Sequence, residues 1–380
     1  MIRALLCTSY VAYILSAVRF MRQSPVSLEL LYGIRATMYV SSIILLFVQY
    51  GNSKAHRIPI APFIMMLLLV PFLTLDARLH YVELVVAVST AVLCLQKAGE
   101  KALVSAAKYG VVTVILVALL AKFELIPNAV IEGKKLFDFR IKNCLGFDNP
   151  NNSFYFLFSS AYVFFALKKR NALILTSFAM LLMLPEVQNK TYTIVLTILL
   201  VLPPIVRKLS CEKLSIWAMF LGSYFVGVVS VLIPNLIFGR ILPVLGVSIP
   251  ILDRITSLRA SKLVRYAEHR SLFSLAFGGK PNPGDSFFLF MVESLGLPIL
   301  MVFFFVSYKA ILSLFAEKKV EHAYAIAVMP LLGLMEAPVS GHSLMIVCYF
   351  YIVLQAFRPV FVRISAVHEG AHPMRVQKAG

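Results

Sequence analysis

Residues 253–285 read DRITSLRASKLVRYAEHRSLFSLAFGGKPNPGD, and from Asp285 to Phe305 the chain reads DSFFLFMVESLGLPILMVFFF. The first stretch is rich in basic residues, and the second is apolar over most of its length. An apolar run of about 20 residues is long enough to cross the hydrocarbon core of a bilayer. The two stretches together predict a membrane span that follows a long, positively charged loop.

The composition extends this reading to the whole chain. Of the 380 residues, 60% are hydrophobic and only 14% are charged, and the mean hydropathy is +0.85. A soluble domain usually carries about 25% charged residues. We therefore expect one all-α, polytopic membrane domain over residues 1–380, with about 12 transmembrane helices.

Successive apolar runs give the expected spans. Two longer polar intervals separate some of them, a shorter one at residues 122–151 and a large one at residues 239–284, which we expect to contain helix. The spans are expected near residues 3–19, 31–50, 58–75, 79–95, 102–121, 153–167, 171–186, 191–206, 214–238, 285–308, 323–338 and 341–357.

The basic connections predict the orientation of these spans. An even number of spans puts both termini on one side, and the side with the Lys- and Arg-rich short connections is expected to be cytoplasmic. Both longer intervals then fall on the external side, together with Arg19 and Arg22, which run against the rule. The connections that define the cytoplasmic side carry Lys54, His56, Arg57, Lys97, Lys101, Lys168, Lys169, Arg170, Arg207, Lys208, Lys213, Lys318, Lys319, Arg358 and Arg363.

The net charge of +18 is consistent with this topology, so nucleic-acid binding is not expected. The five cysteines are scattered without a CxxC pair and predict neither a metal site nor a disulfide framework. The sequence has no P-loop, no GxGxxG, no HExxH and no GxSxG. No cofactor and no metal are therefore expected. If the protein is a transferase, its donor substrate must carry its own activated leaving group.

Basic residues in the large interval recur at helical spacing. Arg259, Lys262, Arg265 and His269 would share one face of a helix. Such a stripe on the external side suits the binding of a phosphate-containing polyanion, because guanidinium groups bind phosphate bidentately. The same spacing is also expected of a basic amphipathic helix that only rests on anionic lipid head groups.

Carboxylates lie near the expected external ends of spans. Asp285 opens the span after the large interval, Glu293 lies about two turns deeper, and Glu336 and His342 flank the last turn. Asp285, Glu336 or the loop residue His269 could accept a proton from a hydroxyl group. Asp285 could equally be a helix cap, and a carboxylate as deep as Glu293 needs a partner or a wet cavity.

Two further span openings are rich in amides. Asn149 and Asn152 open the span near 153–167, and Asn189 opens the span near 191–206. Amides beside the aromatic rings of Phe154, Tyr155 and Tyr192 suit sugar binding, since rings cover the apolar sugar face and amides meet its hydroxyl groups. Lys190 adds a cation at the second opening.

The chain resembles the bacterial O-antigen polymerases and the related O-antigen ligases over roughly residues 140–360. The stretches that resemble the family are GFDNPNNSFYFLF, VQNKTYTIVLTILLVL, LRASKLVRYAEHRSLFSLAFGGKPNPGDSFFLFMVESLGLPIL and MEAPVSGHSLMIVCYFYIVL. Ligases typically carry a histidine at the position of Asp285, so the polymerase is favoured over the ligase.

The resemblance implies an inverting, metal-independent GT-C-type glycosyltransferase of the bacterial inner membrane. Its substrates would be undecaprenyl-diphosphate-linked oligosaccharides on the periplasmic face, where residues 122–151 and 239–284 would be periplasmic loops. Membrane lipid, a chain-length regulator and a flippase are the implied partners. Arg259, Lys190 and Asp285 match polar positions of the family pattern, although Lys190 stands where the family has an arginine.

Three readings of the function therefore remain open. The polymerase reading assigns diphosphate binding to Arg259, Arg265, Lys190 and Lys262. An O-antigen ligase or a polysaccharide flippase would use the same external cations, and a transporter predicts internal repeats with broken helices. A structural membrane protein would tolerate Arg259→Ala and Arg265→Ala without loss.

Overall fold

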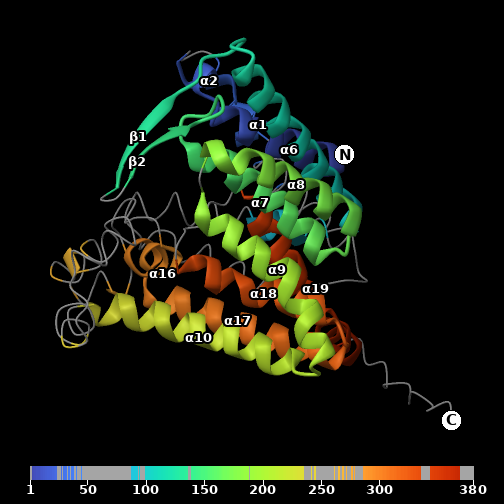
Figure 1. Cartoon of the computed structure of the whole chain (residues 1–380). Coiled ribbons are helices and arrows are strands. Elements are labelled where there is room, and N and C mark those ends of the chain that lie inside the picture. The colour runs from blue at the N-terminus through green and yellow to red at the C-terminus, as the bar shows by residue number, and fades with distance from the viewer. Residues whose placement is uncertain are drawn as a thin grey trace.

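Apolar helices that run back and forth between two ends make up most of the computed structural model (Figure 1). Within the described part of the chain, five helices are long and apolar enough to cross a membrane by length and composition. The chain is therefore mostly helical and compatible with an all-α membrane protein. The structure describes residues 2–23, 99–135, 138–187, 189–234, 286–334 and 343–368, with scattered positions in 27–94 and 241–278.

The helices follow the expected spans closely in the middle of the chain. Helix α6 covers Gly99–Lys122, α7 Pro150–Ala166, α8 Arg170–Val187, α9 Lys190–Lys208 and α10 Glu212–Leu232. Before them come α1 (Ile2–Ser16) and the short α2 (Arg19–Gln23), and after them come α18 (Val320–Gly333) and α19 (Leu344–His368). The predicted total of twelve spans is not established, because residues 45–86 lie outside the described part.

The span expected at residues 285–308 is interrupted. It begins as α16 (Phe287–Phe290), widens into the π-helical turn η4 (Met291–Leu295), and continues after Gly296 as α17 (Leu297–Ala316). Gly296 has φ +90°, which glycine adopts without steric cost, and Pro298 follows in the first turn of α17. The structure thus divides the span expected at residues 285–308 into two helical parts joined at Gly296.

Two further elements depart from the expected pattern. The interval 122–151 contains a two-stranded antiparallel hairpin of β1 (Val130–Lys135) and β2 (Asp138–Asn143), with Val130 opposite Asn143. Helix α19 continues eleven residues past the expected end of the last span at 357, to His368. Arg358 and Arg363 consequently belong to a helix rather than to a loose tail.

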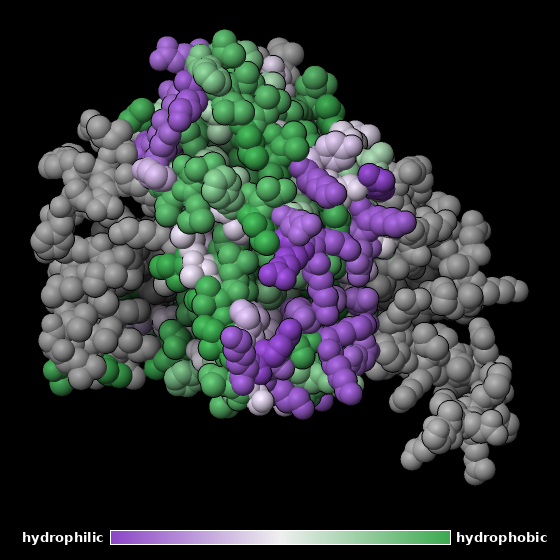
Figure 2. All heavy atoms as spheres, turned by 45° about the vertical axis from the view of Figure 1, so that its right-hand side comes forward, coloured by the Kyte–Doolittle hydropathy of each residue, from purple (hydrophilic) through white to green (hydrophobic). Residues whose placement is uncertain are grey.

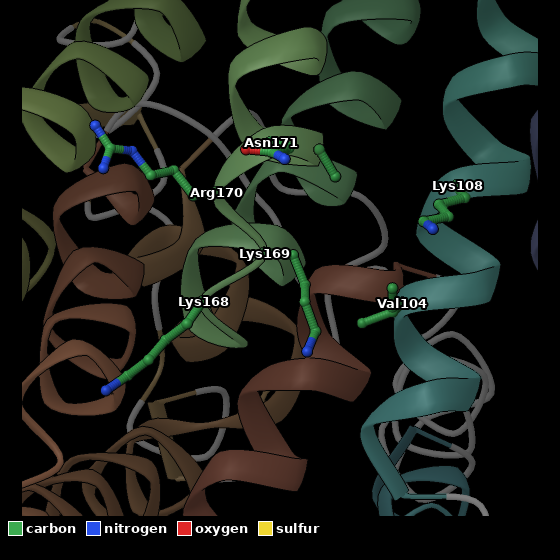
Figure 3. A pocket seen from close by; sticks show the side chains of 7 residues that line it. Val104, Lys108, Lys168, Lys169, Arg170 and Asn171 are labelled. Carbon is green, nitrogen blue, oxygen red and sulfur yellow. The ribbon is translucent and has the colours of Figure 1, made fainter.

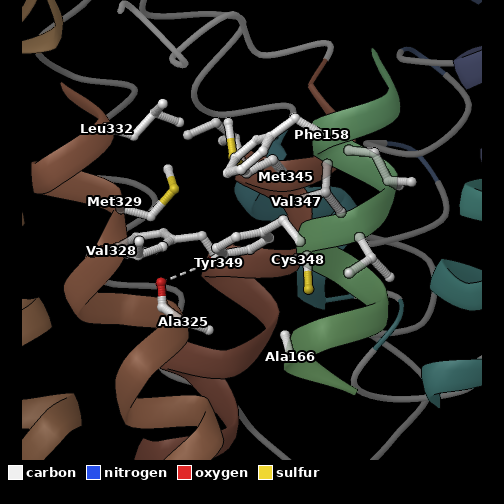
Figure 4. Packing of buried hydrophobic residues seen from close by; sticks show 14 of the residues in the cluster. Phe158, Ala166, Ala325, Val328, Met329, Leu332, Met345, Val347, Cys348 and Tyr349 are labelled. Carbon is white, nitrogen blue, oxygen red and sulfur yellow. Dashed lines mark hydrogen bonds between the residues drawn. The ribbon is translucent and has the colours of Figure 1, made fainter. Parts of the chain in front are cut away.

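Buried aromatic and aliphatic side chains join α7, α18 and α19 at the centre of the molecule (Figure 4). The Tyr162 hydroxyl donates to the Ala325 carbonyl oxygen at 2.9 Å, so the one polar atom of this ring is satisfied within the core. Tyr349 stacks on Phe303 with ring centroids 5.0 Å apart. This packing fixes the directions of the helices relative to one another.

The alternating helices define two ends of the molecule. We call one the cationic end: the α7–α8, α9–α10 and α17–α18 connections and the start of α6 meet there. Figure 2 shows hydrophilic side chains gathered on this side beside a broad hydrophobic surface. Its described basic residues include Lys101, Lys108, Lys168, Lys169, Arg170, Arg207, Lys208, Lys213, Lys318 and Lys319.

Ion pairs connect the helix connections at the cationic end. Glu321 accepts from Lys168 Nζ at 3.0 Å and from Arg207 Nη2 at 3.2 Å, and the Arg207 Nε atom lies 2.9 Å from Glu212. Three connections that are distant in sequence thus share one network. The predicted grouping of basic connections on a single side is confirmed for these described residues.

The opposite end we call the amide end, defined by Asn128, Asn143, Asn149, Asn151, Asn152 and Asn189. Helices α7 and α9 begin there, and α1, α6, α8, α10 and α18 run toward it. In Figure 1 the hairpin and α16 lie on this side, at the left of the view.

Candidate functional site

The start of α7 is a capped helix terminus at the amide end. Asn149 has extended backbone angles, and its side-chain oxygen accepts from the Asn151 N–H at 2.9 Å, while Pro150 occupies the first turn. An asparagine cap followed by proline satisfies the unpaired N–H groups that open a helix. Asn149 therefore has a structural role, and it remains exposed.

The start of α9 is built in the same way and touches α7. Asn189 caps α9 by accepting from the Tyr192 N–H at 3.1 Å, and its amide Nδ2 donates to the Asn151 Oδ1 atom at 3.0 Å. Asn189 is only 4% exposed. The sequence predicted polar openings of two spans, and the structure joins these two openings by a side-chain hydrogen bond.

Aromatic residues follow these amides near the starts of α7 and α9. Tyr155 and Tyr192 have ring centroids 6.1 Å apart, and Tyr192 lies 5.3 Å from Phe158. Tyr192 is buried, whereas Tyr155 is only partly buried. Phe154 is fully buried in the core, so the expectation that its ring covers a sugar was wrong. Tyr155 is the ring of the predicted set that retains exposed surface.

Few of the described amide and aromatic side chains at the starts of α7 and α9 are therefore accessible to a ligand. Asn151 and Asn152 are both partly exposed in the first turn of α7, one turn before Tyr155. Amide groups offer two donors and two acceptors each, which suits vicinal hydroxyl groups. Among the described residues, Asn151 and Asn152, together with Tyr155 one turn later, form the candidate carbohydrate site.

A second network of amide side chains joins the hairpin to α8 at the amide end. Asn128 Nδ2 donates to Asn143 Oδ1 at 2.6 Å, and Asn143 Nδ2 donates to Glu186 Oε2 at 3.1 Å. Glu186 also lies 3.6 Å from Lys122 Nζ. The network ties both ends of the hairpin to the last turn of α8. The sequence pattern did not predict this network, although Asn128 and Asn143 both lie within the polar interval 122–151.

Backbone bonds attach the end of α1 to the residues that precede α7. The Arg19 N–H donates to the Gly146 carbonyl oxygen at 2.9 Å, and the Asp148 N–H donates to the Ala17 carbonyl oxygen at 3.1 Å. Burial raises the pKa of the nearby Cys144 thiol, and Asp148 adds to this while Arg19 opposes it. Arg19 thus lies at the amide end, as the alternation of spans predicts.

The start of α16 reaches the same end by another route. The Ser286 hydroxyl donates to the Gly333 carbonyl oxygen at 3.1 Å, which joins the first turn of α16 to the last turn of α18. Glu293 lies seven residues further along in η4 and is 1% exposed. The predicted deep carboxylate is therefore buried in a π-helical turn beside the core.

Most of the predicted catalytic and diphosphate-binding side chains are outside the described residues. Of those in the large interval, Arg265 is described and is exposed, and Ser261, Val264 and Glu268 beside it are helical. Lys190 opens α9, but its side chain is not described. The predicted residues that lie outside the described part are Arg259, Lys262, His269, Asp285, Glu336 and His342.

Within the described residues, no three His, Cys, Asp or Glu side chains could together hold a metal ion. Compared with known proteins, the chain matches no protein-family model, no curated protein and no solved structure.

Proposed function

We propose that this protein is a polysaccharide polymerase that joins undecaprenyl-diphosphate-linked oligosaccharides at the periplasmic face of the bacterial inner membrane. The observation that carries the proposal is the Asn189–Asn151 hydrogen bond at 3.0 Å. It unites two of the polar openings that carry the resemblance to O-antigen polymerases, and partly exposed amides and a tyrosine ring lie beside it.

The orientation follows from the charges. The cationic end would face the cytoplasm, because short basic connections are retained on that side during insertion. The amide end would then face the periplasm, and both termini would be cytoplasmic. This arrangement brings the amide end to the leaflet in which lipid-linked oligosaccharides would meet.

The reaction would be a direct displacement. A hydroxyl group of the acceptor sugar attacks the anomeric carbon of the donor, the bond from that carbon to phosphate breaks, and undecaprenyl diphosphate leaves. Asp285, Glu336 or His269 accepts the hydroxyl proton. Arg259, Arg265, Lys190 and Lys262 would stabilise the departing diphosphate. No metal is required in this scheme, because the lipid diphosphate is itself the activated leaving group.

Asn151, Asn152 and Tyr155 would hold one of the two sugars in this scheme. The caps formed by Asn149 and Asn189 keep the first turns of α7 and α9 in place, so the amides of the site are oriented before substrate arrives. Two lipid anchors in one leaflet would supply much of the remaining orientation.

The experiment is deletion of the gene in the source bacterium, complementation with variants, and separation of the surface glycan on a gel. Loss of the long-chain ladder with one repeat unit retained supports the polymerase. Complete loss of capped product points to a ligase or flippase, and an unchanged glycan contradicts the proposal. Asn152→Ala should shorten the ladder, while Lys208→Ala, exposed at the cationic end and outside both proposed sites, serves as the control.

A flippase is the second candidate, and the interruption at η4 and Gly296 favours it, because transporters place broken helices at their substrate sites. An inverted-repeat transporter would carry a corresponding break in its first half, and the described helices α1 and α6 there are continuous. Translocation of a fluorescent lipid-linked oligosaccharide in vesicles without glycan joining would support the flippase over the polymerase.

A further inference from the structure

A hollow of about 520 Å³ opens at the cationic end between α6 and the start of α8 (Figure 3). None of its lining residues is acidic. Four of the lining residues are lysine or arginine, and an amide and two aliphatic residues complete the lining. Figure 3 labels Val104, Lys108, Lys168, Lys169, Arg170 and Asn171.

Two lysines from different elements face this space. Figure 3 shows Lys108 on α6 and Lys169 on the α7–α8 connection directed toward the gap between the two elements, whereas Lys168 and Arg170 point the other way. Lys168 is held by Glu321 at 3.0 Å on that far side. The charge that faces the hollow therefore comes from Lys108 and Lys169.

These two ammonium groups are weakly neutralised by the protein. Lys169 Nζ lies 4.0 Å from Glu100, at the limit of an ion pair, and both side chains are more than 40% exposed. Among the described residues, Lys108 has no carboxylate within ion-pair distance. The hollow thus carries a net positive charge, with Lys108 unpaired among the described residues and Lys169 weakly paired, which favours binding of an anion.

The position of Lys108 identifies the kind of anion. Val112, Leu116 and Leu119 follow it on the same face of α6, and they are 62%, 54% and 46% exposed. This face has the apolar character of a lipid-facing surface. Its neighbour Tyr109 is also exposed, and tyrosines of membrane proteins concentrate at head-group level.

The start of α8 adds hydrogen-bond donors to the same wall. Arg170 begins α8, and the first N–H groups of a helix have no partner within it. The Asn171 side chain lies at this first turn and lines the hollow. Lysine ammonium groups, an amide and backbone N–H groups are the donors that bind phosphate oxygens.

We propose that this hollow binds the phosphate of an anionic membrane phospholipid in the leaflet at the cationic end, with Lys108 and Lys169 on either side of the phosphate. Basic pockets between transmembrane helices bind acidic head groups in this way. A lipid fits better than a free phosphate ion because the exposed apolar face of α6 continues from Lys108 as a track for an acyl chain. The proposal does not depend on the glycan reaction.

The test uses the full-length protein in detergent, with bound lipid measured by native mass spectrometry. The probes are phosphatidylglycerol, phosphatidylcholine and inorganic phosphate, applied to Lys108→Ala, Lys169→Ala and the double variant. Lys208→Ala is the matched control, because Lys208 is exposed at the same end but does not line the hollow. Thermal unfolding without lipid verifies that each variant is folded, which their exposed positions lead us to expect.

We expect wild type and Lys208→Ala to retain phosphatidylglycerol preferentially over phosphatidylcholine. Each hollow lysine removed should weaken that binding about fivefold, the usual effect of one basic residue at a membrane surface. Equal retention of phosphatidylglycerol by the double variant and wild type overturns the site. Equal competition by inorganic phosphate at millimolar concentration overturns the assignment to lipid.

Discussion

The two ends of the molecule are held together by different kinds of contact. At the amide end, largely buried or half-buried asparagines bond to backbone N–H groups and to one another, as Asn189 does with Tyr192 and Asn151. At the cationic end, Arg207 and Lys168 pair with Glu321 through side chains that are 57% and 58% exposed. Buried hydrogen bonds fix geometry, whereas exposed ion pairs contribute little to stability.

This difference assigns different roles to the ends. In the functions proposed above, the amides and rings would form a preorganised recognition surface, while the exposed cations would set the orientation in the membrane and attract acidic lipids. The sidedness of the two ends is thus the first property to test, because every functional assignment at the amide end assumes that it faces the periplasm.

The largest expected effect is a complete difference in cysteine labelling between the two ends of the molecule. Leu125, just after α6, is 70% exposed at the amide end, and Leu209, which caps α9, is 68% exposed at the cationic end. In a background without the native cysteines, Leu125→Cys should react with a membrane-impermeant maleimide applied to the periplasmic side. Leu209→Cys should react only after the cells are broken. The reverse pattern would invert the topology and remove the periplasmic site.

The second effect contrasts two glycines with positive φ, one at each end. Gly146 (φ +83°) lies at the amide end, where an added Cβ would meet Ile126 Cδ1 at 2.9 Å. Gly99 (φ +55°) lies at the cationic end with nothing within 4 Å of an added Cβ. Gly146→Ala should therefore cost about 2–4 kcal/mol of unfolding free energy through strain and overpacking. Gly99→Ala should cost about 1 kcal/mol through strain alone.

Denaturant unfolding in detergent, followed by circular dichroism, measures both glycine variants. Equal losses would mean that packing around Gly146 contributes nothing beyond its backbone angle. In that case the amide end would not be more rigid than the cationic end.

The sequence predicts the direction of each helix but not which helices pack side by side. Expected spans at 102–121, 171–186 and 191–206 match α6, α8 and α9 within three residues at every boundary, because lipid-spanning helices are defined by apolar length. The same alternation predicts that Asn151 and Asn189 lie at one end. That they share a hydrogen bond depends on α7 and α9 being adjacent, which hydropathy does not encode.

Departures from the expected fold also have physical reasons. The break at Gly296 hardly lowers the hydropathy of its surroundings, so the run looked continuous, although Gly296 and Pro298 together could have signalled it. The hairpin β1–β2 has short, highly polar strands, and the Asn128–Asn143 contact at its base is tertiary. Helix α19 continues past Arg358 because charge ends a membrane span without ending a helix.

The third effect concerns the two asparagine caps. Asn189→Ala removes a buried cap and leaves the Asn151 side chain without its partner, which should cost about 2 kcal/mol. Asn189→Ser keeps a cap acceptor and should recover about half of that loss. Asn149→Ala removes an exposed cap of the same kind and should cost about 1 kcal/mol or less. A loss for Asn149→Ala as large as that for Asn189→Ala would show that the contact between α7 and α9 adds no stability.

The smallest effect is expected at the cationic end. Glu321→Gln breaks the pairs with Lys168 and Arg207, yet it should change the unfolding free energy by less than about 1 kcal/mol, since both partners are exposed. Glu317→Gln is the control, because the ion pair that Glu317 forms with Lys319 at 2.7 Å is local in sequence. Screening by salt weakens exposed pairs, so raising sodium chloride from low to about 1 M should erase the difference between Glu321→Gln and wild type. A larger loss of unfolding free energy that persists at high salt would contradict this expectation. It would mean that Glu321 stabilises the α7–α8, α9–α10 and α17–α18 connections as strongly as the hydrogen bonds stabilise the amide end.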